Sequence, residues 1–395
     1  MKRPSLEVAD IIRAAGRSFI DQQRFRLNRL YCKVLRAIER CRTAALGGHR
    51  DRCTRCGYTA AISYNSCRNR HCPKCQTNAR DKWLAAREKE LLPVPYVHVV
   101  FTLPRPLARL AFHNKRILYG LLFRTSAASL IEIAADSKHL GAEIGFLSVL
   151  HTWGQNLVHH PHVHCVIPAG GLSPDHRAWV RPRHRFFLPV KALSRVFRGK
   201  FVAALKRAYR NNELCLPGAL KPLSQEKAFR AFVRSLFRHD WVVYAKPPFG
   251  GPQYFLNYLA RYTHRVAISN HRLVAFADGK VTFRWKDYAH SSKQRLMTLT
   301  AEEFLRRFLQ HVLPPGFVRI RFFGFLSPRK RGALLPLCQQ LLQTDPASCS
   351  RPSAPNQSCP PAAWLCPLCG GPMMLLERLD AWQLQQQQRH YIDTS

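Results

Sequence analysis

The sequence predicts an α+β protein, with a helical, zinc-binding N-terminal part followed by a larger part that contains a β-sheet. Three observations lead to this prediction. Residues from about Leu6 to Leu46 carry apolar side chains at helical spacing. Two Cys-x-x-Cys pairs, which begin at Cys53 and Cys72, follow with the spacing of a structural zinc site. Beyond them, strand-like and helical segments alternate, and two of the strands are separated by only a short loop.

The composition indicates a nucleic-acid partner. The 395 residues include 62 Lys and Arg against 23 Asp and Glu, so the formal net charge is +39. A globular protein tolerates this self-repulsion most easily when its partner is a polyanion. Hydrophobic residues make up 46% of the chain, which is enough for a packed core. A membrane surface is the second candidate, but no basic amphipathic helix or acylation signal supports it strongly.

The sequence contains neither a secretory signal nor an apolar run of about 18 residues or more. We therefore expect a cytosolic protein with no membrane partner and no small-molecule substrate. In the cytosol its 14 cysteines are expected to be thiols or metal ligands rather than disulfides.

The two Cys-x-x-Cys pairs predict one tetrahedral zinc site, because each pair supplies two thiolates from one tight turn. The alternative is a set of buried reduced cysteines, which rarely falls into paired spacing. The predicted ligands are Cys53, Cys56, Cys72 and Cys75. Spare donors that could substitute for a ligand or support a second ion are Cys67, His71 and His49. Basic residues that suit contacts with DNA phosphates lie in the same module, among them Arg68, Arg70 and Lys74.

A histidine-rich strand follows two helical segments, at about 76–92 and 114–135, and two strands, at about 96–103 and 145–153. The strand runs from His160 to Ile167, and its short connection to the preceding strand makes the two antiparallel neighbours. Side chains two apart on a strand point to one face, so His162 and His164 project together. Two neutral imidazoles side by side form half of a metal site. The alternative is a histidine-rich edge that faces solvent.

The stretch from Arg181 to Arg207 is very basic and includes Arg183 and Arg185. Phenylalanines lie among its basic residues, at positions 186, 187, 197 and 201. This pattern suits a path for single-stranded nucleic acid, where bases stack on rings and phosphates are neutralised. A helix with a solvated basic face and a buried stripe of Phe side chains explains the pattern equally well.

Two tyrosines lie four residues apart in a predicted helix that follows Pro252. Their spacing places Tyr258 and Tyr262 on one helical face, and Tyr254 continues the stripe. Taken alone, such a stripe is more often core packing than chemistry. After it we expect strands at 273–276 and 281–285, a helix from Thr300 to about Val312, and a linker at 341–361. The pair Cys366 and Cys369 then forms half a zinc knuckle, for which Cys349 and Cys359 are possible partners.

The strand histidines and the paired tyrosines together suggest a phosphoryl-transfer chemistry. A metal ion held by two imidazoles and a third ligand polarises a scissile phosphate. A tyrosine phenolate is then the nucleophile, and a covalent phosphotyrosine conserves the energy of the broken bond. The pKa of phenol is near 10, so the cation and nearby arginines must help the phenol to ionise. Arg261 and Arg265, which lie beside the tyrosines in sequence, are expected to contact DNA, as are Arg183 and Arg185.

Three separated motifs resemble one family. The runs 152–157 and 160–166, with His162-Val163-His164, are similar to the HUH motif of rolling-circle insertion-sequence transposases. The run from Tyr258 to Asn270 resembles that family's tyrosine motif, and the run from Ser66 to Gln76 resembles its zinc-binding domain. The family is the insertion-sequence-ninety-one group, and the resemblance extends from about residue 10 to 328.

The resemblance implies a central antiparallel sheet flanked by helices, with an N-terminal zinc domain. It also implies cutting of single-stranded DNA at the ends of a mobile element in a bacterial cytosol, with Mg²⁺ or Mn²⁺. On this chain His162 and His164 become metal ligands, and Tyr258 and Tyr262 become nucleophiles. The third metal ligand is left between His264 and Gln155. The expected division is a helical and zinc-binding domain at 1–95, a catalytic domain at 96–330, and a linker and C-terminal tail at 331–395.

Two alternatives stay open at this point. A rolling-circle replication initiator or relaxase shares the histidine pair and the tyrosines, but the zinc knuckle favours the transposase and no Gly-Lys-Ser/Thr phosphate loop is present. A non-catalytic zinc-ribbon protein explains the charge and the cysteines, but leaves the strand histidines and paired tyrosines as coincidences. A transposase with separated acidic metal ligands is disfavoured, because neither central motif contains an acidic residue.

Overall fold

The computed structural model of the protein describes residues 4–23, 27–182, 188–249, 267–287, 293–344, 365–384 and 386. The chain forms two compact units, and each is built from segments that are distant in sequence. Unit 1 consists of Met1–Ala79, Ile268–Leu309 and Arg351–Ser395. Unit 2 consists of Arg80–Ala267 and Gln310–Ser350.

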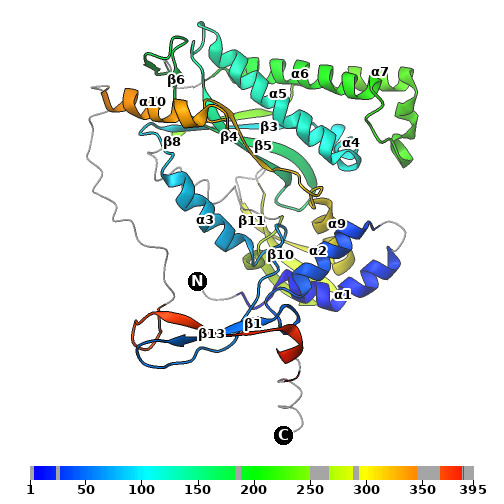
Figure 1. The fold of residues 1–395 in the computed structure, drawn as a ribbon. Coiled ribbons are helices and arrows are strands. Elements are labelled where there is room, and N and C mark those ends of the chain that lie inside the picture. Colours follow the sequence, from blue (N-terminus) through cyan, green and yellow to red (C-terminus); the bar gives the residue numbers. More distant parts are fainter. Residues whose placement is uncertain are drawn as a thin grey trace. The chain divides into compact units, whose positions relative to one another are not determined.

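Unit 2 is organised around a five-stranded sheet that is antiparallel throughout (Figure 1). Its strand order is β12-β4-β5-β3-β8. The strands, in that order, are Ile320–Gly324, Gly145–Trp153, His159–Pro168, Tyr96–Thr102 and Val243–Phe249. The two longest strands, β4 and β5, lie in the middle, so the histidine-rich strand is flanked by a partner on both sides.

One face of this sheet packs against helices α5 (Lys115–Ala135) and α6 (Val190–Arg210) (Figure 1). Alternate residues of the strands point into this core, because side chains on a strand alternate between faces. On β5 these are Val163, Cys165 and Ile167, all fully buried. The helices contribute a dense set of aliphatic and aromatic side chains, including Leu122, Phe123, Phe197 and Phe201.

The opposite face of the sheet carries a second, smaller apolar cluster and the strand histidines. Tyr96, Leu147, Val149 and Val166 pack together there. Trp83 and Leu84 of helix α3 (Gln76–Glu88), together with Phe322 of β12, pack against this cluster. The two faces therefore differ: one is sealed by long helices, and the other combines a small apolar patch with polar rings.

Helix α5 is long and apolar enough to span a membrane by length and composition alone. However, 72% of its most apolar window is buried inside the protein. It is the central core helix of unit 2, and its apolar surface is explained by the sheet and helices that it contacts.

The remaining elements of unit 2 are short helices and strands around this core. They are α4 (Leu107–His113), β6 (Gly171–Leu172), β7 (Trp179–Val180), η2 (Gly218–Ser224), α7 (Glu226–Ser235) and α10 (Arg331–Thr344). A small cluster below the β6–β7 hairpin joins Trp179 and Phe325 to Leu335 and Leu342 of α10. Part of the region predicted as a linker and tail, 331–344, is thus a helix packed on unit 2.

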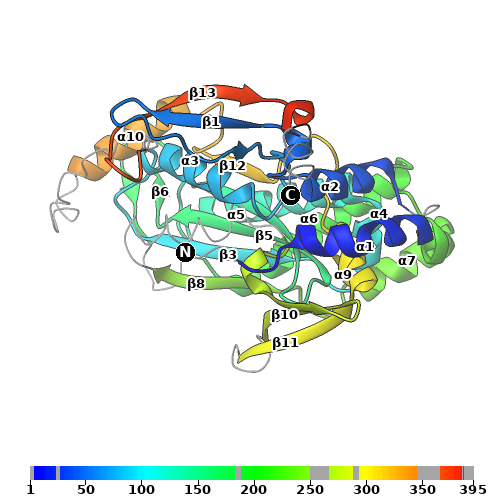
Figure 2. The same ribbon diagram turned by 90° about the horizontal axis from the view of Figure 1, so that it is seen from below.

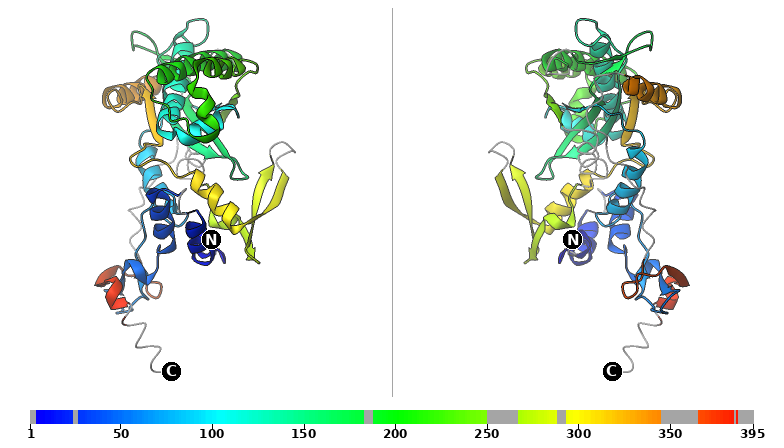
Figure 3. Two further views of the ribbon diagram at one scale, coloured as in Figure 1. Left: turned by 90° about the vertical axis from the view of Figure 1, so that its right-hand side faces the viewer. Right: turned by 90° about the vertical axis from the view of Figure 1, so that its left-hand side faces the viewer.

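Unit 1 contains two small antiparallel sheets. In one, β1 (Gly48–Cys53) lies between β13 (Met373–Leu379) and the short β2 (Ser63–Tyr64), so strands that are distant in sequence pair side by side (Figures 1 and 2). In the other, β10 (Lys280–Asp287) lies between β9 (Leu273–Ala277) and β11 (Lys293–Thr300), and it precedes α9 (Ala301–Gln310) (Figure 3, yellow). The other elements are α1 (Val8–Gln22), α2 (Arg29–Glu39), η1 (Ala44–Leu46) and η3 (Asn270–Arg272).

The predicted fold class is confirmed: helices and a central antiparallel sheet, with cysteine clusters that involve the N-terminal region. The predicted antiparallel pairing of 145–153 with the histidine strand is also confirmed. The N-terminal periodic segment contains two helices rather than one, since α1 ends at Gln22 and α2 begins at Arg29. The division at residues 95 and 330 stays a prediction of the domain organisation.

The predicted nucleic-acid path along 181–207 is wrong for two of its rings. Phe197 and Phe201 are fully buried, and they pack edge-on against Trp241 with ring centroids 5.3 Å away in both cases. Rings held in a core cannot stack on bases, so the alternative reading of a basic helix with a buried Phe stripe applies to them. Phe186 and Phe187 lie outside the described residues.

We predict that Gly324→Ala destabilises unit 2. Gly324 ends β12 with a φ of +59°, and an added Cβ would lie 1.7 Å from the Ile144 carbonyl oxygen. Relieving this clash must move β12 away from β4, so we expect the free energy of unfolding to fall by more than about 2 kcal/mol. Chemical denaturation followed by circular dichroism measures the change.

Gly332→Ala is the matched control, because Gly332 lies in α10 and no atom lies within 4 Å of an added Cβ. Alanine favours a helix over glycine by up to about 1 kcal/mol, so this variant should be as stable as the parent or slightly more stable. Equal stability of the Gly324→Ala protein and the parent would contradict the close packing of β12 against β4.

Candidate metal centres

Three histidines come together on the sheet face opposite α5 and α6. They are His151 on β4 and His162 and His164 on β5, and their ligand nitrogens all lie within 4.8 Å of one another. The strand register explains the grouping: His151 lies directly opposite His162, and residues in register share a face. His151 and His164 are buried, whereas His162 is partly exposed, so the cluster is accessible from one side.

Hydrogen bonds orient two of the three rings. Nδ1 of His162 lies 2.6 Å from the backbone oxygen of His160, so it carries the proton and donates it. Nδ1 of His164 lies 2.8 Å from Nε2 of His98, a buried residue of β3 whose ring stacks on it. In both rings Nδ1 is thus engaged, which directs Nε2 to the cluster. Such outer partners fix the tautomer of metal-binding histidines.

Burial keeps the rings of His162 and His98 neutral. It lowers the pKa of His162 to about 4 and the pKa of His98 to about 3. Neutral imidazoles retain a lone pair on nitrogen and can therefore bind a cation at neutral pH without first losing a proton. The donor set of three imidazoles suits a divalent first-row metal ion.

The other predicted members of the catalytic site are placed only in part. Gln155 lies in the turn between β4 and β5, at residues 154–158. The other predicted third ligand, His264, lies outside the described residues, as do both tyrosines, Tyr258 and Tyr262. Four arginines predicted to contact DNA also lie outside them: Arg183, Arg185, Arg261 and Arg265.

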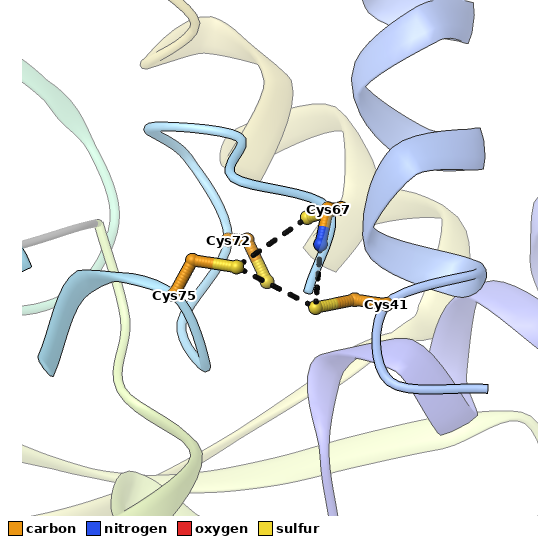
Figure 4. Close-up of side chains that lie close together, drawn as sticks. All are labelled: Cys41, Cys67, Cys72 and Cys75. Atoms are coloured by element: carbon orange, nitrogen blue, oxygen red, sulfur yellow. Dashed lines mark hydrogen bonds between the residues drawn. The ribbon is translucent and has the colours of Figure 1, made fainter. Parts of the chain in front are cut away.

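Four cysteines of unit 1 point toward one another in the N-terminal region (Figure 4). They are Cys41, from the turn after α2, and Cys67, Cys72 and Cys75, from the loop before α3. The Sγ atoms of Cys41 and Cys75 are 3.5 Å apart, and those of Cys67 and Cys75 are 3.6 Å apart. Bonds of about 2.3 Å to a tetrahedral zinc ion place sulfurs about 3.8 Å apart, so the cluster fits zinc.

Electrostatics within this cluster favour a cation. Hydrogen bonds from the neighbouring thiols, that of Cys41 first, strongly lower the pKa of Cys75. The pKa of Cys72 is raised, because its proton is held by the surrounding sulfurs, again Cys41 first. The backbone N–H of Cys67 also donates to Sγ of Cys41, over 3.5 Å. Four thiolates cannot share this small volume without a positive charge among them.

The predicted grouping of Cys53, Cys56, Cys72 and Cys75 into one zinc site is wrong. Cys72 and Cys75 belong to the cluster above, whereas Cys53 and Cys56 lie beside Cys366 and Cys369. The reason is β1, which carries Cys53 at its end and pairs with β13 from the far end of the chain. The spare donor Cys67 is a full member of the first cluster. Among the described residues, His71 belongs to neither cluster.

The three predicted phosphate-binding residues of the knuckle differ in exposure. Arg68 is exposed and Arg70 is half-buried. Lys74 forms an ion pair with Glu7, with 2.5 Å between Nζ and Oε2, and donates to the Cys41 carbonyl over 3.4 Å. Lys74 therefore has a structural role in tying the loop to α1 and α2, and its contact with DNA stays a prediction, as do those of Arg68 and Arg70.

Sequence reasoning missed two key residues, His151 and Cys41. His151 lies in the strand before the histidine pair, and only the register of β4 with β5 brings it into the cluster. Cys41 has no second cysteine at x-x spacing, so it carries none of the usual sequence signal of a zinc ligand. The alternation along 145–153 puts His151 on the face of Leu147 and Val149, which is the signal that could have found it.

Comparisons with known proteins find two family models that match the chain. A family model described as "Transposase zinc-binding domain", of the IS91 type, matches residues 11–103, and one described as "Putative transposase" matches residues 145–333. The first range contains the cluster of Cys41, and the second contains the three histidines. No solved structure matches the chain.

Two curated relatives are similar over most of the chain. A protein of Sinorhizobium fredii named "Putative transposase y4qJ" is 52% identical over 357 residues, which cover 90% of this chain and 89% of the relative. A protein of Pseudomonas savastanoi pv. phaseolicola named "Transposase for insertion sequence element IS801" is 30% identical over 288 residues, which cover 71% of this chain and 66% of the relative.

We predict that Cys41→Ser removes zinc from the N-terminal cluster. Loss of one of four thiolates opens the tetrahedral site, so the zinc content of the purified protein should fall by about one equivalent. Inductively coupled plasma mass spectrometry measures the content. The matched control is Cys32→Ser, because Cys32 lies on α2 but belongs to neither cluster. Full zinc content in the Cys41→Ser protein would refute the grouping.

Proposed function

Because the chain belongs to the IS91 family of DNA transposases, we propose that it nicks and rejoins single-stranded DNA at the ends of its mobile element. The reaction is a metal-assisted transesterification through a 5′-phosphotyrosine, and transposition follows a rolling-circle-like course. The observation that carries the proposal is the group of three imidazoles, His151, His162 and His164, on one accessible sheet face. The main apolar core, with α5 and α6, lies on the other face, so packing against those helices does not require such a group.

His162 and His164 are proposed to hold Mg²⁺ or Mn²⁺ through Nε2, and His151 is proposed as the third ligand. The hydrogen bonds at Nδ1 of His162 and His164 support this assignment, since they direct the other nitrogen of each ring to the cluster. When bound, the ion would polarise a non-bridging oxygen of the scissile phosphate and stabilise the charge that develops there. His98 positions His164 and does not itself reach the cluster's centre.

Tyr258 and Tyr262 are proposed as the nucleophiles. The phenol of one tyrosine loses its proton to a base or to solvent, and its oxygen attacks the phosphorus. The bond from phosphorus to the 3′ oxygen breaks, and that oxygen takes up a proton to leave as a 3′-OH. Their four-residue spacing would put both rings on one face of a helix, so one tyrosine can hold a DNA end while the other cleaves a second site.

The positive charge of the chain is proposed to guide the DNA strand. Phosphate contacts are assigned to Arg68, Arg70, Lys74, Arg183, Arg185, Arg261 and Arg265. With a net charge of +39, binding should weaken steeply as salt is raised, because DNA releases bound counterions. The catalytic domain is proposed to extend over residues 96–330, and the protein is proposed to act on DNA in the bacterial cytosol.

The first test is formation of a covalent adduct. Purified protein is mixed with Mn²⁺ and a single-stranded oligonucleotide that carries the element's end, and the products are separated on a denaturing gel. We expect a protein–DNA adduct on the 5′ phosphate side and a free 3′-OH on the other fragment. The double variant Tyr258→Phe, Tyr262→Phe should form none, because no other nucleophile is assigned.

Tyr254→Phe is the control for this test, since Tyr254 continues the stripe but has no assigned chemistry. It should form as much adduct as the parent. An adduct of undiminished yield in the double variant would overturn the tyrosine mechanism, and an adduct on a different tyrosine would identify the correct nucleophile by peptide mapping.

The second test identifies the third metal ligand. Mn²⁺ binding is measured without DNA by electron paramagnetic resonance or calorimetry, on the single variants His151→Ala and Gln155→Ala. Loss of a ligand should weaken binding by about 100-fold or more, and we expect this of His151→Ala only. His160→Ala is the matched control, because His160 lies on the same strand but outside the cluster. Weak binding in Gln155→Ala together with normal binding in His151→Ala would reverse the assignment.

A further inference from the structure

The pair Cys366 and Cys369, close to the end of the chain, lies beside Cys53 and Cys56 in unit 1. The two pairs are 310 residues apart in sequence, measured from Cys56 to Cys366. Neither family model that matches the chain extends to the second pair, since the models cover 11–103 and 145–333. The function proposed above makes no use of these four thiols.

The two pairs have the same local structure. In each, the backbone N–H of the first cysteine donates over 2.8 Å to the oxygen five residues on, from Cys53 to Tyr58 and from Cys366 to Gly371. The glycine after each pair, Gly57 or Gly370, donates back to the oxygen of that first cysteine and has a φ of +73° or +66°. An isolated β-bridge closes each turn. Two matching turns that present thiols to each other are the arrangement that zinc ribbons use.

The sulfur atoms have the spacing of a metal site rather than that of disulfides. Sγ of Cys53 lies 3.5 Å from Sγ of Cys369, and Sγ of Cys56 lies 3.6 Å from Sγ of Cys366. A disulfide requires about 2.05 Å, whereas a tetrahedral zinc ion gives about 3.8 Å. The backbone N–H of Arg55 donates to Sγ of Cys53, and that of Gly371 donates to Sγ of Cys369. These hydrogen bonds stabilise a negative charge on the two sulfurs.

Gly371 leaves room for this arrangement. A Cβ at that position would lie 3.3 Å from Sγ of both Cys53 and Cys369, and 2.9 Å from Cβ of Arg55. The backbone of the second turn thus passes directly against the sulfur atoms of both pairs. The strands continue the contact, since β1 pairs with β13 from Gly48 and Leu379 to Cys53 and Met373.

Apart from its pairing with β1, the described C-terminal segment has few packing contacts to hold it in place. Over residues 365–384, few apolar side chains are buried, among them Leu379 and Leu384. Several large ones are exposed instead: Leu365, Leu368, Met374, Leu375, Leu376 and Trp382. One ion pair, Arg50 with Glu377 at 3.2 Å, is partly exposed and contributes little. Small elements without a core of their own are commonly held together by a metal ion.

We infer that Cys53, Cys56, Cys366 and Cys369 bind a second structural zinc ion, which fastens the C-terminal segment to the N-terminal zinc module. The site is distinct from the cluster of Cys41, so the described residues would hold two zinc ions. It makes β13 an integral part of unit 1 and gives β1 its longest strand partner.

The test is a metal count on the full-length protein, by inductively coupled plasma mass spectrometry for zinc and iron. The parent should carry about two zinc ions per chain, and the double variant Cys366→Ser, Cys369→Ser should carry about one. Cys215→Ser is the control, because Cys215 is an exposed cysteine outside both clusters, and it should keep the full content.

A second measurement does not depend on the folding of a variant. The parent is loaded with Co²⁺, and thiolate-to-metal absorption is titrated against added metal. Saturation at about two equivalents supports the inference, whereas saturation at one overturns it. One zinc ion in the folded parent, or a double variant that keeps the full zinc content, also overturns it. Iron in place of zinc at this site would overturn the assignment of zinc.

Discussion

The antiparallel pairing of β4 with β5 is the constraint on which the candidate catalytic site depends. Its register sets His151 opposite His162 and Val149 opposite His164. Because the side-chain period of a strand is two, a slip of one residue would turn His162 and His164 toward the α5 core. That core is filled by Val163, Cys165 and Ile167, which have no space for a polar ring, so packing on one face holds the imidazoles on the other.

This arrangement also explains how the proposed metal ligand His162 stays neutral in a protein of such high positive charge. The cluster's rings are shielded by burial, which lowers the pKa of His162 to about 4, and His98 behind them is likewise kept uncharged. A cationic imidazole at this position would add to the repulsion that any metal ion already meets. The basic residues of the chain can then bind DNA phosphates, while the sheet face with the histidines remains able to bind a cation.

Much of the fold followed from local patterns, and the failures have one physical cause. The strands at 96–102 and 145–153 and the helix at 115–135 could be predicted because each is a run rich in apolar residues. Pairings between distant segments carry no local signal, so the join of β1 to β13 was not expected. For the same reason, the sequence did not show that Cys53 lies beside Cys366 and Cys369, or that His151 lies beside His162 and His164. Phe197 shows that a local pattern can also mislead. The basic residues around it suggested a contact with DNA, but its side chain is buried in the core.

The interleaving of the two units along the chain has a consequence for synthesis. Every residue of unit 2 precedes residue 351, whereas unit 1 needs Arg351–Ser395 to be complete. At about 5–20 residues per second, the 310 residues between Cys56 and Cys366 take about 15–60 s to translate. During that time β1 can pair with β2 but not with β13. Synthesis of unit 2 is therefore complete before that of unit 1. A chain that terminates early lacks β13, the strand that completes the N-terminal sheet.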